Sequence, residues 1–176
     1  MKQRTCKICK VRYTPEYSSL MALCSPECIV KYHRNLKEKS EKKATKLLKD
    51  SLKTKSDYIK ILQILVNRYV RQRDLGNSCI SCDTILTEKI KYDAGHMYPT
   101  TYQFLRFNED NINGQCVRCN RDLHGNASEY RPKLEAKIGV ERLQWLHAHR
   151  HDRFDLTIED LKELIKKYKN KLAELK

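Results

Sequence analysis

The sequence lacks a long hydrophobic run and is poor in acidic residues. No stretch approaches the roughly 18 consecutive apolar residues of a membrane-spanning helix. The N-terminal MKQRTCKICK also lacks the apolar core of a secretory signal. Hydrophobic residues make up only 40% of the 176 residues, so a single core along the whole length is not expected. We therefore predict a cytoplasmic chain built from small units, with no membrane partner.

Basic residues outnumber acidic ones. The chain has 36 Lys and Arg against 22 Asp and Glu, a formal net charge of +14. Two zinc sites of four thiolates, each carrying −2, would lower +14 to +10. A chain this basic is expected to bind a polyanion, most commonly nucleic acid, rather than a small-molecule substrate.

No cysteine lacks a close partner in the sequence. In a reducing cytosol, paired cysteines usually bind metal, and disulfide pairing is the alternative. The first two pairs lie in residues 1–30, a segment so poor in apolar side chains that zinc would supply much of its folding free energy. The four pairs are Cys6 and Cys9, Cys24 and Cys28, Cys79 and Cys82, and Cys116 and Cys119.

Residues 31–56 contain neither Gly nor Pro and predict a basic helical linker. Residues 31–60 hold eleven Lys and Arg against four acids, so this helix is either a solvated spacer or a contact for DNA phosphates. Residues 57–75 carry apolar side chains at helical spacing, with Ser56 as the expected N-cap. Their apolar stripe is expected to pack on the chain's own core or on a second subunit.

The C-terminal third predicts further helices. Residues 127–151 read as one or two helices broken at Gly139, and the run from His147 to Arg153 is either a solvated helix end or a site for metal or phosphate. Thr157 to Asp160 forms a capping box that opens a lysine-rich helix. The predicted parts are thus 1–30, 31–56, 57–151 and 152–176. The core candidates in 127–151 are Leu134, Ile138, Leu143, Trp145 and Leu146.

The second cysteine set encloses an insertion. Between Cys82 and Cys116 lie 33 residues, too many for a compact zinc ribbon, so the insertion is expected to carry function. It reads as a strand that ends near His96, a loop, and a second short strand after Asn111. The last cysteine then runs directly into Asn120 and His124.

This order of residues resembles the HNH, or ββα-metal, endonucleases. The zinc cysteines that end in Cys-x2-Cys-Asn are similar to those of phage resolvases of the endonuclease VII type. From about residue 68 to residue 146 the chain also resembles the phage NinG (Rap) recombination nucleases. The motifs that carry this likeness are Cys79-Ile-Ser-Cys82, Asp93-Ala-Gly-His96, Arg106 to Asn120, His124-Gly-Asn126, Tyr130-Arg131 and Ile138 to Leu143.

The resemblance implies a fold and an activity. The fold would be α+β and mostly helical, with a small zinc-stapled ββα-metal core of treble-clef type, flanking helices and a separate N-terminal zinc unit. The activity would be a structure-specific endonuclease of phage recombination that cuts branched DNA, such as Holliday junctions and D-loops, in the cytoplasm of a bacterial host.

The resemblance also assigns roles to residues. His96 would be the general base, since a neutral histidine accepts a water proton near pH 7. Asn111 would fix the loop that orients His96. Mg²⁺ or Mn²⁺ would be the catalytic metal, bound by Asn120 and His124, which share one face if their segment is helical. Both four-cysteine zinc ions would be structural, because four thiolates leave no open position.

One position departs from the HNH pattern. Many HNH sites carry an acid directly before the general base, and Gly95 stands there. Asp93 points to the same face of a regular strand, so it is either a replacement metal ligand or a solvated acid.

The sequence also leaves the mode of DNA binding open. Arg106, Arg118, Arg121 and Arg131 are expected to contact phosphates. Paired cuts would favour a homodimer. The alternatives are an HNH enzyme that nicks ordinary duplex DNA, and a non-catalytic two-zinc nucleic-acid-binding module, which Gly95 favours.

Overall fold

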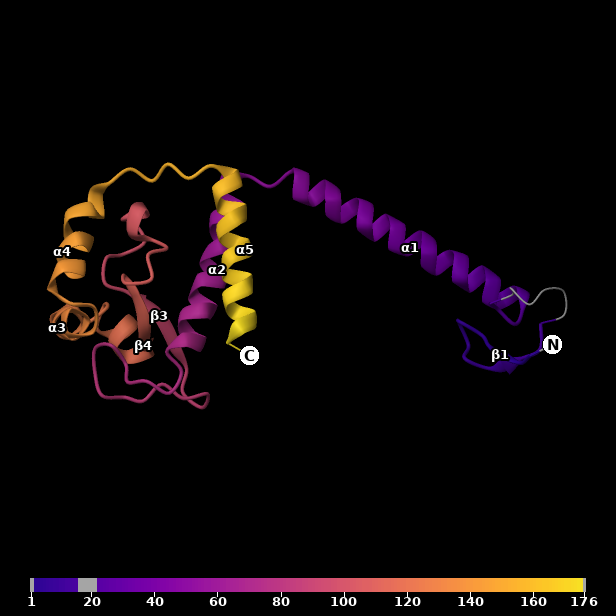
Figure 1. Cartoon of the computed structure of the whole chain (residues 1–176), viewed down its shortest axis with the longest axis horizontal. Helices are drawn as coiled ribbons and strands as arrows, with labels where there is room; N and C mark the ends of the chain where they lie inside the picture. Colours follow the sequence, from indigo (N-terminus) through magenta and orange to yellow (C-terminus); the bar gives the residue numbers. More distant parts are fainter. Residues whose placement is uncertain (1, 16–21, 176) are drawn as a thin grey trace. The chain divides into compact units, whose positions relative to one another are not determined.

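The computed structural model describes residues 2–15 and 22–175 and divides the chain into two compact units, 1–53 and 54–176 (Figure 1). The division lies inside the predicted linker 31–56. The ends of the predicted 1–30 and 152–176 parts, together with residues 16–21, lie outside the described residues. Within the described residues, no helix is long and apolar enough to cross a membrane.

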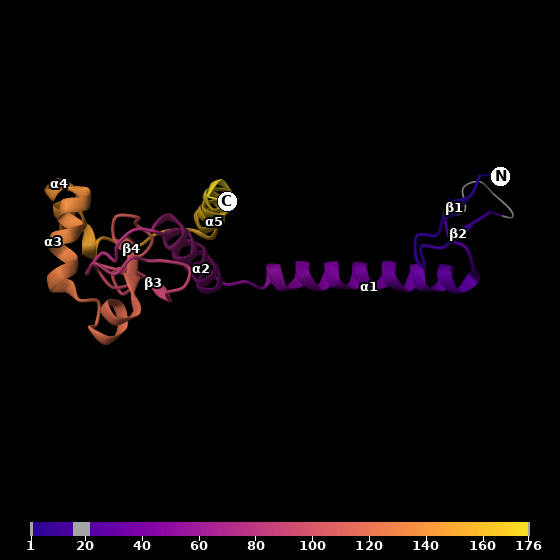
Figure 2. The ribbon, with the colours of Figure 1, turned by 90° about the horizontal axis from the view of Figure 1, so that it is seen from below.

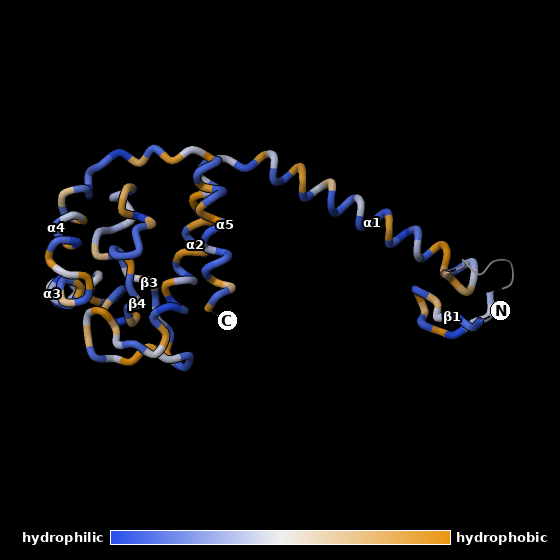
Figure 3. Tube along the Cα trace, viewed as in Figure 1, coloured by the Kyte–Doolittle hydropathy of each residue, from blue (hydrophilic) through white to orange (hydrophobic). Residues whose placement is uncertain are grey.

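The first unit is a short hairpin followed by one long helix. Strands β1 (Arg4–Thr5) and β2 (Arg12–Tyr13) pair antiparallel, and α1 (Pro26–Ser51) follows. Ser25 caps α1 by accepting a hydrogen bond from the Cys28 backbone at 3.3 Å. Helix α1 therefore begins inside the four-cysteine segment, rather than at its predicted end. Figure 2 shows α1 as a single uninterrupted helix, and Figure 3 shows hydrophilic residues on every turn.

In the second unit, two capped helices pack side by side (Figure 1). Helix α2 (Lys55–Arg73) begins after Thr54, which forms a capping box with Asp57, so the predicted N-cap Ser56 is wrong. Both Thr54 and Ser56 are good N-caps, but only Thr54 has an acid three residues on. Helix α5 (Ile158–Glu174) opens with the predicted box between Thr157 and Asp160.

The apolar faces of these helices are buried within the same unit. Leu62, Val66 and Val70 of α2 meet Leu161 and Ile165 of α5, and Ala94 and Ile112 of a β-hairpin complete this core. The stripe on α2 thus packs on the chain's own core. A dimer would use a surface other than this one.

The hairpin connects this core to a second one. Strands β3 (Tyr92–His96) and β4 (Ile112–Cys116) pair antiparallel, with His96 opposite Ile112. A short 3-10 turn, η1 (Gln103–Leu105), lies between them, and a five-residue π-helical turn, η2 (Arg118–Asp122), follows β4. Helices α3 (Ala127–Ile138) and α4 (Val140–Ala148) are broken at Gly139 as predicted, and η3 (His149–His151) follows.

The second core contains most of the predicted residues but not Trp145. Leu134, Leu143 and Leu146 pack with Leu105 and Tyr130, and Ile138 lies against them. Trp145 is 43% exposed, so its assignment to the core is wrong. It lies two residues from Leu143 and one from Leu146, which places it off the buried face of α4.

Candidate functional site

The eight cysteines form two groups whose sulfurs lie within 4.8 Å of one another. The printed sulfur pairs are Cys9 and Cys24 at 3.3 Å, Cys24 and Cys28 at 3.7 Å, and Cys82 and Cys116 at 3.8 Å. A disulfide would need about 2.05 Å. Four sulfurs about 2.3 Å from one tetrahedral zinc ion lie about 3.8 Å apart. The two groups, Cys6, Cys9, Cys24 and Cys28, and Cys79, Cys82, Cys116 and Cys119, therefore fit structural zinc.

The second group ties β4 to the loop after α2. Cys116 is the last residue of β4, and its backbone N–H donates to the Cys79 sulfur at 3.3 Å. The Ser81 N–H donates to the same sulfur at 3.5 Å, and the Cys119 N–H donates to Cys116 at 3.5 Å. Such N–H donors favour thiolates, the form in which cysteine binds zinc.

His96 ends strand β3 and is partly buried. Its Nε2 lies 3.2 Å from the Arg106 carbonyl oxygen. A carbonyl only accepts, so Nε2 holds the proton of the neutral ring and Nδ1 holds the lone pair. Burial lowers the pKa of His96 below its ordinary value of 6.5. The ring is therefore neutral at pH 7 and able to accept a proton.

Asn111 is fully buried and fixes the loop after His96. Its Oδ1 accepts the Tyr98 N–H at 2.7 Å, while its Nδ2 donates to the carbonyls of Tyr98 and Leu105 at 3.0 and 3.1 Å. The Met97 N–H donates to the Asn111 carbonyl at 2.9 Å. Both ends of the loop from 98 to 105 thus hang on one amide, a position suited to its predicted role.

Asp93 and Asn120 are brought together across the hairpin and η2. Asn120 Nδ2 donates to Asp93 Oδ2 at 3.0 Å. Arg121 donates to both carboxylate oxygens, from Nε at 2.7 Å and from a terminal nitrogen at 2.8 Å. These bonds from Arg121 hold the pKa of Asp93 below its usual range and raise the pKa of Arg121. Asp93 is therefore a cation-binding acid, and its cation in the structure is a guanidinium.

The neighbouring strand explains why position 95 is glycine. A Cβ at Gly95 would lie 2.1 Å from Gln115 Oε1, so no side chain fits there. Gln115 is fully buried, and its Nε2 donates to Ser81 Oγ and to the Gly125 carbonyl, both at 2.7 Å. This amide joins β4 to both cysteine turns. Sequence reasoning missed Gln115, because only its register beside Gly95 reveals its role.

His124 lies apart from the position that its predicted role requires. The helical turn η2 ends at Asp122, and His124 has a left-handed backbone with φ 48°. The expected shared helix face with Asn120 is therefore wrong. Gly125 and Asn126 are also left-handed, which turns the chain before α3 begins. Asp93, His96 and His124 do not form a group of ligand atoms within 4.8 Å.

The four predicted phosphate contacts differ in their surroundings. Arg121 is bound to Asp93, as described above. Arg106 is partly buried and donates from Nε to Gln63 at 2.7 Å. Arg118 and Arg131 are exposed, and within the described part of the chain neither belongs to an ion pair.

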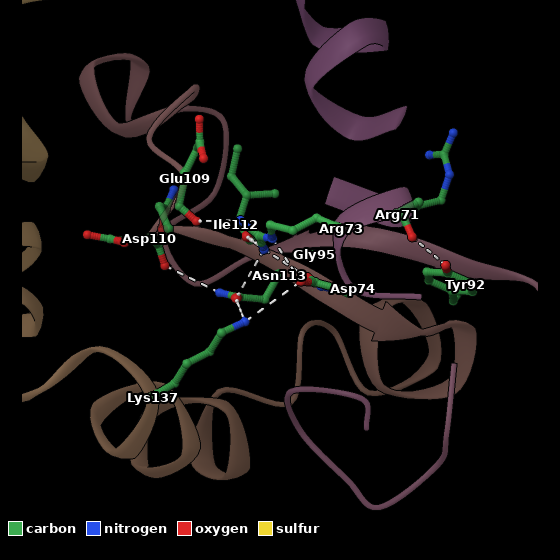
Figure 4. A network of polar contacts seen from close by, with 12 residues as sticks. Arg71, Arg73, Asp74, Tyr92, Gly95, Glu109, Asp110, Ile112, Asn113 and Lys137 are labelled. Atoms are coloured by element: carbon green, nitrogen blue, oxygen red, sulfur yellow. Dashed lines mark hydrogen bonds and ion pairs between the residues drawn. The ribbon is translucent and has the colours of Figure 1, made fainter. Parts of the chain in front are cut away.

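A buried polar network holds the other side of β4 (Figure 4). Asp74 accepts two hydrogen bonds from Arg73, at 2.8 and 2.7 Å, and one from the Gly114 N–H at 2.7 Å. Burial alone would raise the pKa of Asp74, but Arg73 outweighs it and the pKa is lowered. Lys137 donates to Asn113 at 2.7 Å, which extends the network to α3.

The network reaches the strand that carries His96. Asn113 Nδ2 donates to the Tyr130 hydroxyl at 3.1 Å, and that hydroxyl donates to the Gly95 carbonyl at 3.1 Å. The sequence analysis placed Arg73 on the polar side of its helix and did not single out Asp74. A charged residue just after an amphipathic helix gives no sign of burial.

The chain matches known proteins over its full length. The family model described as the bacteriophage lambda NinG protein covers residues 1–176. The NinG protein of Escherichia phage lambda is 35% identical over 196 aligned residues, which cover 99% of this chain and 94% of that protein. Those of Enterobacteria phage H19B and Salmonella phage P22 are 37% and 34% identical, with the same coverage. No solved structure matches the chain.

Proposed function

The chain belongs to the NinG family of bacteriophage proteins, and on that premise we propose that it is a metal-dependent endonuclease that cuts branched DNA. The observation that carries this proposal is the 3.0 Å contact between Asp93 and Asn120. It places an acid and an amide together on the strand that ends at His96. The arrangement follows the HNH pattern, with the short turn η2 in place of the α-helix of a ββα-metal core.

In this function His96 is the general base. Its lowered pKa keeps the ring neutral, and Nδ1 takes the proton of the attacking water. Asn111 is a positioning residue, since it fixes the loop that follows His96.

Asp93 and Asn120 are the proposed ligands of a catalytic Mg²⁺ or Mn²⁺, which prefer such oxygen donors. A bound divalent ion would polarise the scissile phosphate and stabilise the leaving oxygen. Arg121 occupies both oxygens of Asp93 in the structure. On binding of the ion it leaves Asp93 and contacts a DNA phosphate, together with the exposed Arg118 and Arg131.

The net charge of +14 supports DNA as the partner, and the resemblance to recombination nucleases supports branched DNA. Two cuts at one junction require two active sites, so we propose a homodimer that acts in the cytoplasm of a bacterial host.

The test compares a four-way junction with a linear duplex of the same sequence, in Mg²⁺ or Mn²⁺. His33 is an exposed histidine on α1, and His33→Ala is the matched control for His96→Ala. We expect the wild type and His33→Ala to cut the junction, and His96→Ala to be slower by about 10²- to 10⁴-fold. Absence of cleavage by the wild type would contradict the enzyme. Equal cleavage of both substrates would instead indicate an HNH enzyme that nicks ordinary duplex DNA.

A second candidate is a non-catalytic two-zinc module that binds nucleic acid. The ion pair between Arg121 and Asp93 favours it, because it closes the only pair of oxygen ligands that we assign to a catalytic metal. Tight junction binding without cleavage in either metal would support this candidate.

A further inference from the structure

An exposed group of rings lies where α4 and η3 meet the loop after His96. Trp145 is 43% exposed and Phe104 is 36% exposed. Exposed large rings of this kind often mark a binding surface. We define the aromatic–histidine surface as these rings and those in contact with them, which are Tyr98, Tyr102, Phe104, Trp145, His147, His149 and His151.

Three of the rings are close to parallel. Trp145 and His149 stack with centroids 4.3 Å apart and planes at 20°. Phe104 lies 6.4 Å from His149, with planes at 23°. Stacked rings that keep one face in solvent resemble the way an aromatic side chain meets a nucleobase.

The rings are held in place before any ligand binds. His149 Nδ1 donates to the Trp145 carbonyl at 2.8 Å, which fixes the histidine ring. Leu146 and Leu105, the chain neighbours of Trp145 and Phe104, are fully buried. A surface ordered in advance loses little conformational entropy when it binds.

The surface is joined to the candidate site. Tyr98, two residues after His96, has its hydroxyl 3.0 Å from His147 Nδ1. Asn111 holds both Tyr98 and Leu105, the ends of the loop that carries Phe104. Beside the surface lies a hollow lined by Tyr102, Arg150 and His151, among others. Arg150 supplies positive charge suited to a phosphate backbone.

We propose that the aromatic–histidine surface binds unpaired nucleobases next to the branch point by stacking. The inference rests on the proposed function, because it assumes that DNA is the substrate. Phosphate contacts alone do not distinguish paired from unpaired strands. Bases in a duplex have their faces covered, whereas unpaired bases at a branch can be splayed onto aromatic rings. The surface would thus select branched DNA over a continuous duplex.

Trp145 is the only tryptophan of the chain, so its fluorescence reports on this surface alone. The experiment titrates the full chain, without divalent metal, with a single-stranded oligonucleotide. A second oligonucleotide of equal length carries abasic sites, and a third probe is a duplex. We expect the single strand to quench Trp145 and to bind about tenfold more tightly than the abasic strand, which has the same phosphates. The duplex should leave the fluorescence unchanged.

The variants are Trp145→Leu and Phe104→Leu, with Gln144→Ala as an exposed control on the same helix. A labelled oligonucleotide measures binding where tryptophan is absent. The leucine variants should lose the preference for bases over abasic sites, and the control should keep it. An unchanged preference in both leucine variants would overturn the proposal. So would a Trp145→Leu chain that dissociates from dimer to monomer yet binds DNA normally, since the surface would then face a second copy.

The outcome is separable from that of the proposed function, because this assay needs no cleavage. A chain that cuts junctions but shows no base preference retains the function and loses the stacking surface. A chain that shows the preference but never cuts retains the surface and loses the enzyme.

Discussion

The two four-cysteine groups differ in what surrounds them. In the described part of the first unit, the buried residues are Cys6, Pro15 and Cys28, and no apolar core is present there. The second group packs with Leu86 and is joined to two apolar cores by the hairpin. The same ligand set thus serves two purposes. In the first unit the metal takes the place of a core, whereas in the second it fastens a hairpin that other contacts also hold.

Zinc removal should give the largest difference between the two groups. Structural zinc contributes about 10–16 kcal/mol to small zinc domains, so Cys9→Ser or a strong chelator should unfold the β1–β2 hairpin. Cys82→Ser should loosen the β3–β4 hairpin and leave α2 and α5 folded. Amide NMR spectra of the full chain would follow both units. A first-unit hairpin that stays folded without zinc would break the comparison.

The Asp74 network should contribute most among the contacts that hold the second group. Asp74→Ala leaves Arg73 without its carboxylate, which should lower the free energy of unfolding by about 3 kcal/mol. Asp83→Ala is the control, because Asp83 is fully exposed in its pair with Lys133 and should change stability by less than about 0.5 kcal/mol. Urea unfolding measures both.

The same network predicts a dependence on pH. The pKa of Asp74 is lowered in the folded chain. Its contribution is therefore present above the unfolded value of about 3.9 and is lost as the pH falls through the folded pKa. Asp74→Ala should lack this acid loss, and equal acid sensitivity of variant and wild type would contradict the assignment.

Gly95→Ala tests the close approach of Gln115. The added Cβ would overlap the amide oxygen, which should cost about 1–3 kcal/mol. Gln115→Ala removes the clash, so the double variant should lose less stability than the two single losses added together. Strict additivity in thermal unfolding would show that the two side chains do not meet.

Helix caps should give the smallest effects, of different kinds in the two units. Ser25→Ala and Thr157→Ala each remove one cap, worth about 1 kcal/mol. In the second unit this loss should appear as lower stability. In the first unit, where folding requires metal, it should appear as zinc binding weakened about fivefold. Ser25→Ala with unchanged zinc affinity would argue that the first unit folds without its metal.

Local signals made part of this fold predictable. The cysteine pairs, the break at Gly139 and the Thr157 capping box depend on residues a few positions apart, and the structure confirms each of them. Trp145 was misplaced because helical spacing allows more apolar residues than the core of α4 accommodates.

The rest of the site depends on contacts between distant residues. Arg121 lies 28 residues from Asp93, and their ion pair follows from the way η2 packs against β3. Gln115 fills the space at Gly95 only in the observed strand register. The position of His124 depends on three left-handed residues, of which only Gly125 is a residue typical of that conformation.

The most direct test of the account is the pH dependence of junction cleavage in a single turnover. The wild-type rate should be level near neutral pH and should fall with the loss of one proton site at a pH below 6.5, since burial lowers the pKa of His96. His96→Ala should be slower at every pH and should lack this acid limb. An acid limb that persists unchanged in His96→Ala would contradict His96 as the base at the zinc-held hairpin.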